Sequence, residues 1–190
     1  MVEWIDLQQL YKRLGFMSNP HSIVVAIVSD THGVLDQRIA ELIKQADIAV
    51  HAGDIGNANV IDAMQPKKGK VYAVVGNNDV TAKWPRQQHN VLHTLPEHIM
   101  VNLPGGELHV VHGHKQSSNA TRHKKLRQLY PQARVIVYGH SHRLLIDQSD
   151  LPWGINPGAA GKSRTFGGPS CLLLRASHAH WHLDSIRFDK

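Results

Sequence analysis

Residues 23–33 read IVVAIVSDTHG, and this stretch decides the class of fold. Its first six residues are all apolar, which is typical of a strand that is buried on both faces. Two more runs of this kind follow at residues 48–50 and 71–75, with predicted helices at residues 39–44 and 60–64 between them. Because strands alternate with helices, the first half of the chain predicts a parallel sheet in an α/β fold.

The second half of the chain predicts a second sheet and one more helix. Short strands are predicted at residues 91–95, 99–103, 107–111, 135–138, 144–147, 154–156, 170–175 and 180–188, and the helix at residues 120–130. We therefore expect a single domain over residues 23–190. Residues 1–22 predict a helical extension ahead of it, because apolar side chains at helical spacing mark residues 3–14. This apolar stripe either packs onto the domain or contacts a partner or a second subunit of a homo-oligomer.

The composition indicates a globular protein and excludes several classes. Apolar residues make up 42% and charged residues 19% of the 190, which argues against a disordered chain. The single cysteine, Cys171, excludes an internal disulfide. The longest apolar run is far shorter than the roughly 20 residues of a membrane span. The first residues carry acidic side chains where a signal peptide would be basic, so we expect a cytoplasmic protein with no membrane partner.

Each buried strand runs into a short loop whose side chains are able to bind a metal. The five loops are residues 29–33 (SDTHG), 51–54 (HAGD), 76–79 (GNND), 112–114 (HGH) and 139–142 (GHSH). Ligand sites of open α/β sheets lie beyond the carboxyl ends of the strands, so these loops should converge. Carboxylate, amide and imidazole groups suit divalent ions such as Mn, Fe and Zn. Any one of these motifs alone is more often a turn, but all five in order predict a metal site.

The five motifs, in this order, resemble the signature of the calcineurin-like metallophosphoesterase superfamily over residues 23–188. The small size and the segment Ile155-Asn156-Pro157-Gly158 are similar to one branch, which holds small bacterial and archaeal phosphodiesterases and the scaffold subunit of retromer. The resemblance implies a four-layer αββα sandwich, in which helices flank two mixed β-sheets. It also implies a hydrolase that cleaves a small phosphodiester.

The resemblance assigns a role to each candidate metal ligand. It implies two divalent ions, with manganese as the first choice and Fe, Zn, Ni or Co as alternatives. A bridging residue would hold both ions together with a water or hydroxide that attacks phosphorus in line with the leaving alcohol. The implied ligands are Asp30, His32 and His142 for one ion, Asn77, His112 and His140 for the other, and Asp54 as the bridge.

One position departs from the pattern of many relatives, which have a histidine directly after the metal-binding asparagine. Here that residue is Asn78, whose amide donates a hydrogen bond to a phosphoryl oxygen but delivers no proton. We therefore predict substrate contact and a catalytic role for Asn78, with His114 or a metal-bound water as the proton source. Lys162 or Arg164 could also reach the substrate phosphate, and of the two we select Arg164 as a substrate-binding residue.

Two other functions stay open. A non-catalytic scaffold on the same fold is the first alternative, although such a protein is free to lose ligands and this chain keeps all seven. A nuclease is the second, with the basic stretch of residues 122–127 guiding a strand toward the metals. The formal charge of +6 would suit a nucleic acid, but aromatic residues are only 6% and scattered, which disfavours base stacking.

Overall fold

The computed structural model describes residues 22–116 and 119–189, so the helix predicted at residues 3–14 lies outside the described residues. Strand β1 lies in the middle of the first of two five-stranded sheets, whose order is β10-β9-β1-β2-β3. It pairs in parallel with β2, which pairs in parallel with β3, while β9 and β10 are antiparallel. The strands are β1 (Ile23–Val28), β2 (Ile48–His51), β3 (Lys70–Ala73), β9 (Ser170–Ala176) and β10 (Trp181–Arg187).

The second sheet has the order β4-β5-β6-β8-β7. Its central strands β5, β6 and β8 are parallel, and the edge strands β4 and β7 are antiparallel to their neighbours. Both sheets are therefore mixed. The strands are β4 (His98–Leu103), β5 (Gly106–Val111), β6 (Val135–Val137), β7 (Leu144–Asp147) and β8 (Trp153–Pro157).

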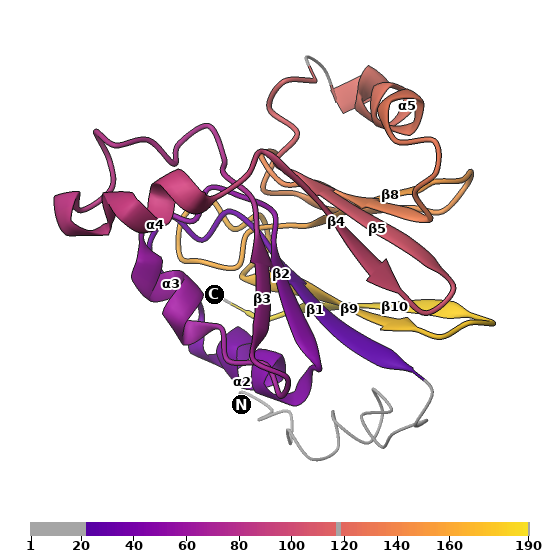
Figure 1. Ribbon diagram of the computed structural model, residues 1–190, viewed down its shortest axis with the longest axis horizontal. Helices are drawn as coiled ribbons and strands as arrows, with labels where there is room; N and C mark the ends of the chain where they lie inside the picture. The colour runs from indigo at the N-terminus through magenta and orange to yellow at the C-terminus, as the bar shows by residue number, and fades with distance from the viewer. Residues whose placement is uncertain (1–21, 117–118, 190) are drawn as a thin grey trace.

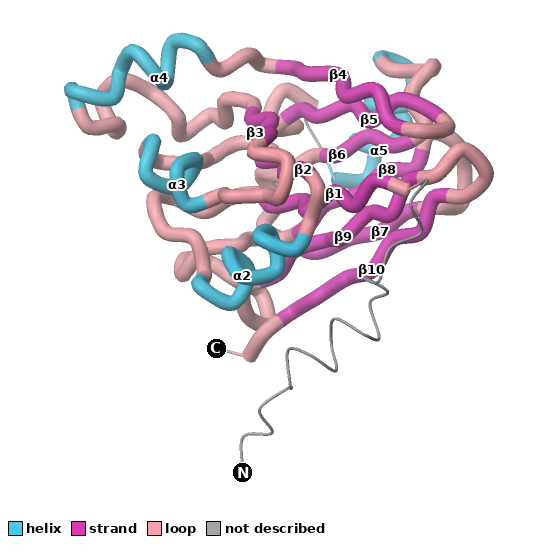
Figure 2. The backbone as a smooth tube through the Cα atoms, turned by 60° about the horizontal axis from the view of Figure 1, so that its bottom comes forward, coloured by secondary structure: helices cyan, strands magenta, loops and turns pink. Residues whose placement is uncertain are grey.

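Helices cover the outer faces of the sheets, so the predicted four-layer αββα sandwich is confirmed (Figures 1 and 2). Helices α2 (Gln37–Gln45) and α3 (Ala58–Ala63) lie on the first sheet, and α5 (Asn119–Leu129) lies on the second. Alternate side chains of each sheet point inward, and residues such as Val25, Leu108 and Val137 form one buried cluster between the sheets. A second cluster joins α2 to the first sheet, and a third joins α5 to the second.

The strand predicted at residues 91–95 is wrong, because this segment forms helix α4 (His89–Thr94) after a short 3-10 helix, η1 (Arg86–Gln88). Val91, Leu92 and Leu95 are spaced for one helical face as well as for a short strand. Leu92 is buried against the cluster that contains Trp84 and Ile55, so packing favours the helix. The other elements predicted between residues 23 and 188 are confirmed, with ends that differ by a few residues.

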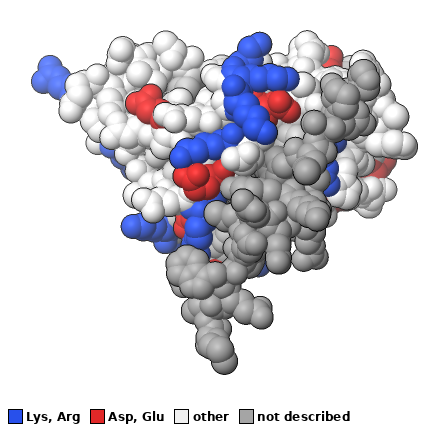
Figure 3. All heavy atoms as spheres, turned by 90° about the horizontal axis from the view of Figure 1, so that it is seen from below, with Lys and Arg blue, Asp and Glu red and all other residues white. Residues whose placement is uncertain are grey.

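The charges on the described surface are mixed, and no described helix is long and apolar enough to cross a membrane. Figure 3 shows basic and acidic side chains next to one another on the face seen from below. The described residues also include ion pairs, such as Arg38 with Asp36 and Arg175 with Asp184. The net positive charge therefore does not gather into one uniform patch on this face, which gives the nuclease reading no support there.

The parallel strands of both sheets end at the same edge of the sandwich. Val28 pairs with His51 at the end of β1 and β2, so the loops that follow lie side by side. Backbone hydrogen bonds join these loops: Asp30 N–H donates to the Gly53 carbonyl and His32 N–H to the Asp54 carbonyl. Gly139 N–H donates in the same way to the His112 carbonyl. The strand order thus brings the five predicted ligand loops together.

Candidate metal centre

Four of the predicted ligands form one cluster. Asp30, His32, Asp54 and His142 each place one ligand atom within 4.8 Å of the others. The Nε2 atoms of His32 and His142 are 3.2 Å apart, and the two rings stack. His142 Nε2 is 3.3 Å from Asp30 Oδ1, and His32 Nε2 is 3.8 Å from Asp54 Oδ2. The chain therefore has a group of carboxylate and imidazole ligands that could hold a metal ion.

The three remaining predicted ligands lie together beside this cluster. Asn77 Oδ1 is 3.1 Å from His112 Nε2 and 3.0 Å from His140 Nδ1. His112 Nε2 is also 3.4 Å from Asp54 Oδ1. Asp54 thus turns one carboxylate oxygen toward each group, Oδ2 to the first and Oδ1 to the second. All seven residues that the sequence singled out converge on one place.

The backbone at the site adopts a conformation that L-residues rarely take. Among the described residues, six other than glycine have a positive φ, and five of them are predicted ligands. The left-handed conformation costs about 1–2 kcal/mol for a residue with a Cβ, so the surrounding structure must hold each one in place. The six are Asp30, His32, Asp54, His140, His142 and Arg164, with φ between 48° and 68°.

Buried hydrogen bonds orient two histidine rings. His112 Nδ1 donates to the Ala52 carbonyl over 2.8 Å, so Nε2 is the ring nitrogen that faces Asn77 Oδ1 and Asp54 Oδ1. At His51, Nδ1 accepts from Gly53 N–H, so Nε2 carries the proton and donates to Thr31 Oγ1. Thr31 then donates to the Ile55 carbonyl. Burial lowers the pKa of His51 to about 4, so the ring is neutral, as this chain of bonds requires.

Two residues to which the sequence assigned no role hold the ligand loops in place. The buried carboxylate of Asp79 accepts hydrogen bonds from the N–H groups of Ile55, Gly56 and Gly76 and from Trp84 Nε1. It thereby ties the Asp54 loop to the Asn77 loop. The signal was available in the last residue of the GNND motif, but turn chemistry explains an aspartate there equally well.

Asn156 plays a similar part on the other side of the site. Its Nδ2 donates to the Gly139 carbonyl over 2.7 Å and to Ser141 Oγ over 3.1 Å, the two residues on either side of His140. Its Oδ1 accepts from Gly158 N–H. In the Asn77 loop, residue 76 must be a glycine because a Cβ at Gly76 would lie 2.2 Å from Asp54 Oδ1. These contacts hold the ligand loops in position.

The electrostatics of the site suit a cation. Burial raises the pKa of Asp30 to about 7, and Asp30 Oδ1 is fully buried without a hydrogen-bond partner among the described residues. Burial would also raise the pKa of Asp54, but hydrogen bonds from His112 and Asn78 and the charge of His112 hold it well below its usual range. Burial lowers the pKa of His142 to about 4, so its ring is neutral at pH 7 and has one nitrogen lone pair to offer a metal. A buried carboxylate oxygen that receives no hydrogen bond would be stabilised strongly by a metal ion. The ligands of this site therefore fit a divalent cation.

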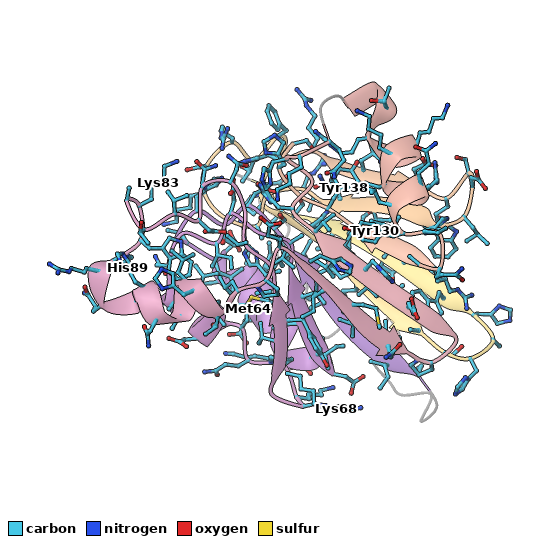
Figure 4. All side chains as sticks on the ribbon, turned by 45° about the horizontal axis from the view of Figure 1, so that its top comes forward. Met64, Lys68, Lys83, His89, Tyr130 and Tyr138 are labelled. Carbon is cyan, nitrogen blue, oxygen red and sulfur yellow. The ribbon has the colours of Figure 1, made fainter. Side chains whose placement is uncertain are left out.

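The predicted substrate-side residues lie at the rim of this centre. Asn78 donates through its backbone N–H and its Nδ2 to the two oxygens of Asp54, 2.8 and 2.7 Å away. Lys83, which lies on the loop between β3 and α4 (Figure 4), donates to Asn78 Oδ1. Arg164 Nη2 is 3.3 Å from His32 Nε2. The His114 ring lies 5.5 Å from that of His112, and its Nδ1 is buried without a hydrogen-bond partner in the described part of the chain.

The predicted basic face of α5 is only partly exposed. His123 bridges Asp147 Oδ2 and Tyr138 Oη over 2.6 and 2.7 Å, and Arg127 pairs with the same Asp147 oxygen over 3.0 Å. Tyr138 lies beneath α5 (Figure 4), and Arg122 is buried above its ring. These contacts pin the helix to the second sheet, so only Lys124 and Lys125 of the basic stretch remain on the solvent side.

The sandwich with ligand loops at one edge defines a metallophosphoesterase-like protein, and comparison with known proteins agrees. A model of the calcineurin-like phosphoesterase superfamily domain matches residues 23–179. The chain therefore belongs to the calcineurin-like phosphoesterase superfamily. A phosphodiesterase of Methanocaldococcus jannaschii is 28% identical over 142 residues, which are 70% of this chain and 82% of that protein.

Solved structures show the same fold at lower identity. Vacuolar protein sorting 29 of Cryptosporidium parvum superposes with a TM-score of 0.67 at 16% identity, covering 90% of this chain and all of the other. The zinc complex of Vps29 from Entamoeba histolytica gives a TM-score of 0.65 at 17% identity, with 88% and 99% covered. The fold is thus shared by phosphodiesterases and by Vps29 proteins, so function has to be inferred from the site.

Proposed function

We propose that this metallophosphoesterase is a phosphodiesterase that uses two divalent ions, and that manganese is the preferred ion. The observation that carries the proposal is the position of Asp54, whose two oxygens face two separate groups of ligand atoms. Asp30, His32 and His142 would hold one ion, and Asn77, His112 and His140 the other. The phosphodiesterase named among the relatives supports the reaction class.

The proposed chemistry divides between the ions and the chain. When bound, two ions lower the pKa of a water toward neutrality and offset charge on the phosphoryl oxygens. The NH₂ group of Asn78 faces the Asp54 carboxylate, because Lys83 donates to Asn78 Oδ1 from the other side. With Asp54 engaged by metal, this NH₂ group is free to donate to a phosphoryl oxygen. Arg164 Nη2 lies 3.3 Å from His32 Nε2, and with His32 bound to an ion the guanidinium would turn to the substrate phosphate.

His114 is our candidate for the group that hands a proton to the leaving alcohol. Its Nδ1 has no hydrogen-bond partner in the described structure, so no other group competes for that atom. The centroid of its ring lies 5.5 Å from that of His112 and 6.3 Å from that of His140, so His114 would contact a substrate bound beside these two predicted ligands. Asn78 cannot fill this role because an amide has no proton to give at neutral pH.

The test is hydrolysis of a chromogenic phosphodiester and of the matching monoester, with manganese added. We expect metal-dependent cleavage of the diester that Asp54→Asn reduces by at least about 10²-fold, as for the loss of one electrostatic contact to developing charge. The matched control is Asp62→Asn, an exposed carboxylate on α3, which should retain full activity. Undiminished activity in Asp54→Asn would contradict the proposal.

A scaffold is the second candidate, favoured by the likeness of the whole fold to Vps29. The same experiment separates the two functions. If the wild-type protein binds metal and cleaves neither ester, the scaffold is the better account. The complete ligand set and its inbuilt backbone strain argue for catalysis, since a scaffold gains nothing from six strained residues gathered at one point.

A further inference from the structure

A cavity of about 520 Å³ lies beside the metal centre, and the proposed reaction does not use it. Its walls include Asp36, Arg38, Lys162, Arg164 and Phe166. The size falls within the roughly 300–1,000 Å³ of small-molecule sites. It is larger than the reacting phosphate needs, so it has room for a substantial part of one arm of a diester.

The cavity adjoins the first group of ligands. Arg164 lines it and also reaches to 3.3 Å from His32 Nε2. The loop that carries Lys162 and Arg164 is packed tightly at Gly161, where a Cβ would lie 2.3 Å from the Thr31 carbonyl. Ala160 N–H donates to the Ser29 carbonyl, and Ala160 accepts from Asp36 N–H. A ligand in this cavity is therefore held against the same loops that carry Asp30 and His32.

The charge of the cavity is positive. Arg38 and Asp36 neutralise each other through an ion pair of 2.8 Å, so these two contribute no net charge. Lys162 and Arg164 remain in excess. No hydrogen bond or ion pair joins Lys162 to another described residue, and its side chain is exposed. Arg164 adopts the left-handed conformation at φ 52°, a strain that is retained where a side chain must be presented.

An aromatic wall completes the cavity. Phe166 is 46% exposed, so a large part of its ring is accessible to a ligand. The guanidinium of Arg143 lies 4.1 Å from the centre of its ring, which fixes the orientation of the phenyl group. An anchored aromatic ring next to two unneutralised cations suits a ligand with a planar ring and a phosphate.

We propose that this cavity binds the second arm of the substrate, and that this arm carries a planar ring and a further phosphate, as a nucleotide does. This inference rests on the proposed function, because the reacting phosphate must sit at the metal centre. Lys162 would contact the further phosphate and Phe166 would pack against the ring. Arg164, between the cavity and His32, would contact the phosphate that reacts.

Three substrates with the same p-nitrophenol leaving group test the proposal. They are methyl p-nitrophenyl phosphate, thymidine 5′-(p-nitrophenyl phosphate), and the latter compound with an added 3′-phosphate. The wild-type enzyme should show the highest kcat/KM for the third, about tenfold above the second, the worth of one charge-assisted hydrogen bond. Lys162→Met should remove this tenfold preference through KM and leave kcat/KM for the first two unchanged. Phe166→Ala should lower kcat/KM for both thymidine compounds but not for the methyl ester.

A binding measurement keeps the proposal testable even if the protein hydrolyses nothing. Calorimetry would compare thymidine 3′,5′-bisphosphate with thymidine 5′-monophosphate, using the metal-loaded wild-type protein, Lys162→Met and the control Lys124→Met on α5. We expect tighter binding of the bisphosphate by the wild type and by the control, and equal binding in Lys162→Met. Equal affinity for both ligands in the wild type would overturn the inference, whereas failed hydrolysis with selective binding would overturn only the proposed function.

Discussion

The two ends of the sandwich differ in the residues that take the left-handed conformation. At the metal end, aspartate, histidine and arginine take it, as at Asp54 and His142, beside glycines such as Gly53 and Gly113. At the opposite end, where the β4–β5 and β9–β10 turns lie side by side (Figure 1), the residues with a positive φ in the β4–β5 turn are Gly105 and Gly106. Glycine adopts this conformation without strain. A side chain is kept in a strained position only where the chemistry needs it.

The carboxylates at the two ends differ in the same way. Asp30 at the metal end is buried with its pKa raised to about 7. Asp147, at the end of β7 near the turns, is bonded to Ser149, His123 and Arg127, and its pKa is held well below the usual range. Asp30 Oδ1 lacks a hydrogen-bond partner among the described residues, although Oδ2 accepts from His140 N–H, whereas both oxygens of Asp147 have partners. The metal end therefore keeps a buried carboxylate oxygen for an ion, and the turn end does not.

The largest loss of stability is expected for Asp79→Ala, because the buried Asp79 carboxylate holds the ligand loops of the metal end together. Four donors would lose their acceptor, and each unsatisfied buried donor costs about 1–3 kcal/mol, so we expect at least about 3 kcal/mol of destabilisation. Urea denaturation of the metal-free protein measures this loss, with Asp62→Ala as the matched control. A destabilisation below 1 kcal/mol would mean that the loops are held by something else.

A pair of glycine exchanges should change stability in opposite directions. Gly105→Ala places a Cβ at φ +87° and 2.6 Å from the Ser177 carbonyl, so we expect a loss of about 1–3 kcal/mol. Arg164→Gly relieves left-handed strain of about 1–2 kcal/mol against a glycine entropy cost of about 0.5–1 kcal/mol, for a net gain of about 0.5 kcal/mol. The same variant should lose diester hydrolysis. A loss of stability in Arg164→Gly would show that the left-handed conformation at the metal end is not strained, which contradicts the difference between the two ends.

The smallest effect is expected from pH at the turn end. The folded-state pKa of Asp147 lies below its ordinary value of 3.8, so its contribution to stability is complete above about pH 4 and is lost as the pH falls further. Asp147→Asn should therefore lower the urea midpoint at pH 7, and the gap to the wild type should narrow below about pH 4. A gap that stays constant down to pH 2 would show that the charge of Asp147 is not what stabilises the fold.

Much of the fold followed from the sequence because the buried strands of a parallel sheet are continuous apolar runs. The convergence of the seven ligands followed as well, since the carboxyl ends of parallel strands meet at one edge. Residues 91–95 were misassigned because the burial of Leu92 against Trp84 is a tertiary contact. The pairing of His123 with Asp147 and the cavity beside Arg164 could not be predicted, for the same reason. Each is formed by segments that are far apart in the sequence and meet only in the folded chain.

The most direct test of the account is the number of ions that the protein binds. Metal-free protein would be equilibrated with manganese and the bound metal counted by elemental analysis, for the wild type, Asn77→Ala and Asp54→Ala. We predict about two ions per chain for the wild type, as a two-metal centre requires, one for Asn77→Ala, and none for Asp54→Ala. A single ion in the wild type at saturation, or two ions in Asp54→Ala, would contradict the account.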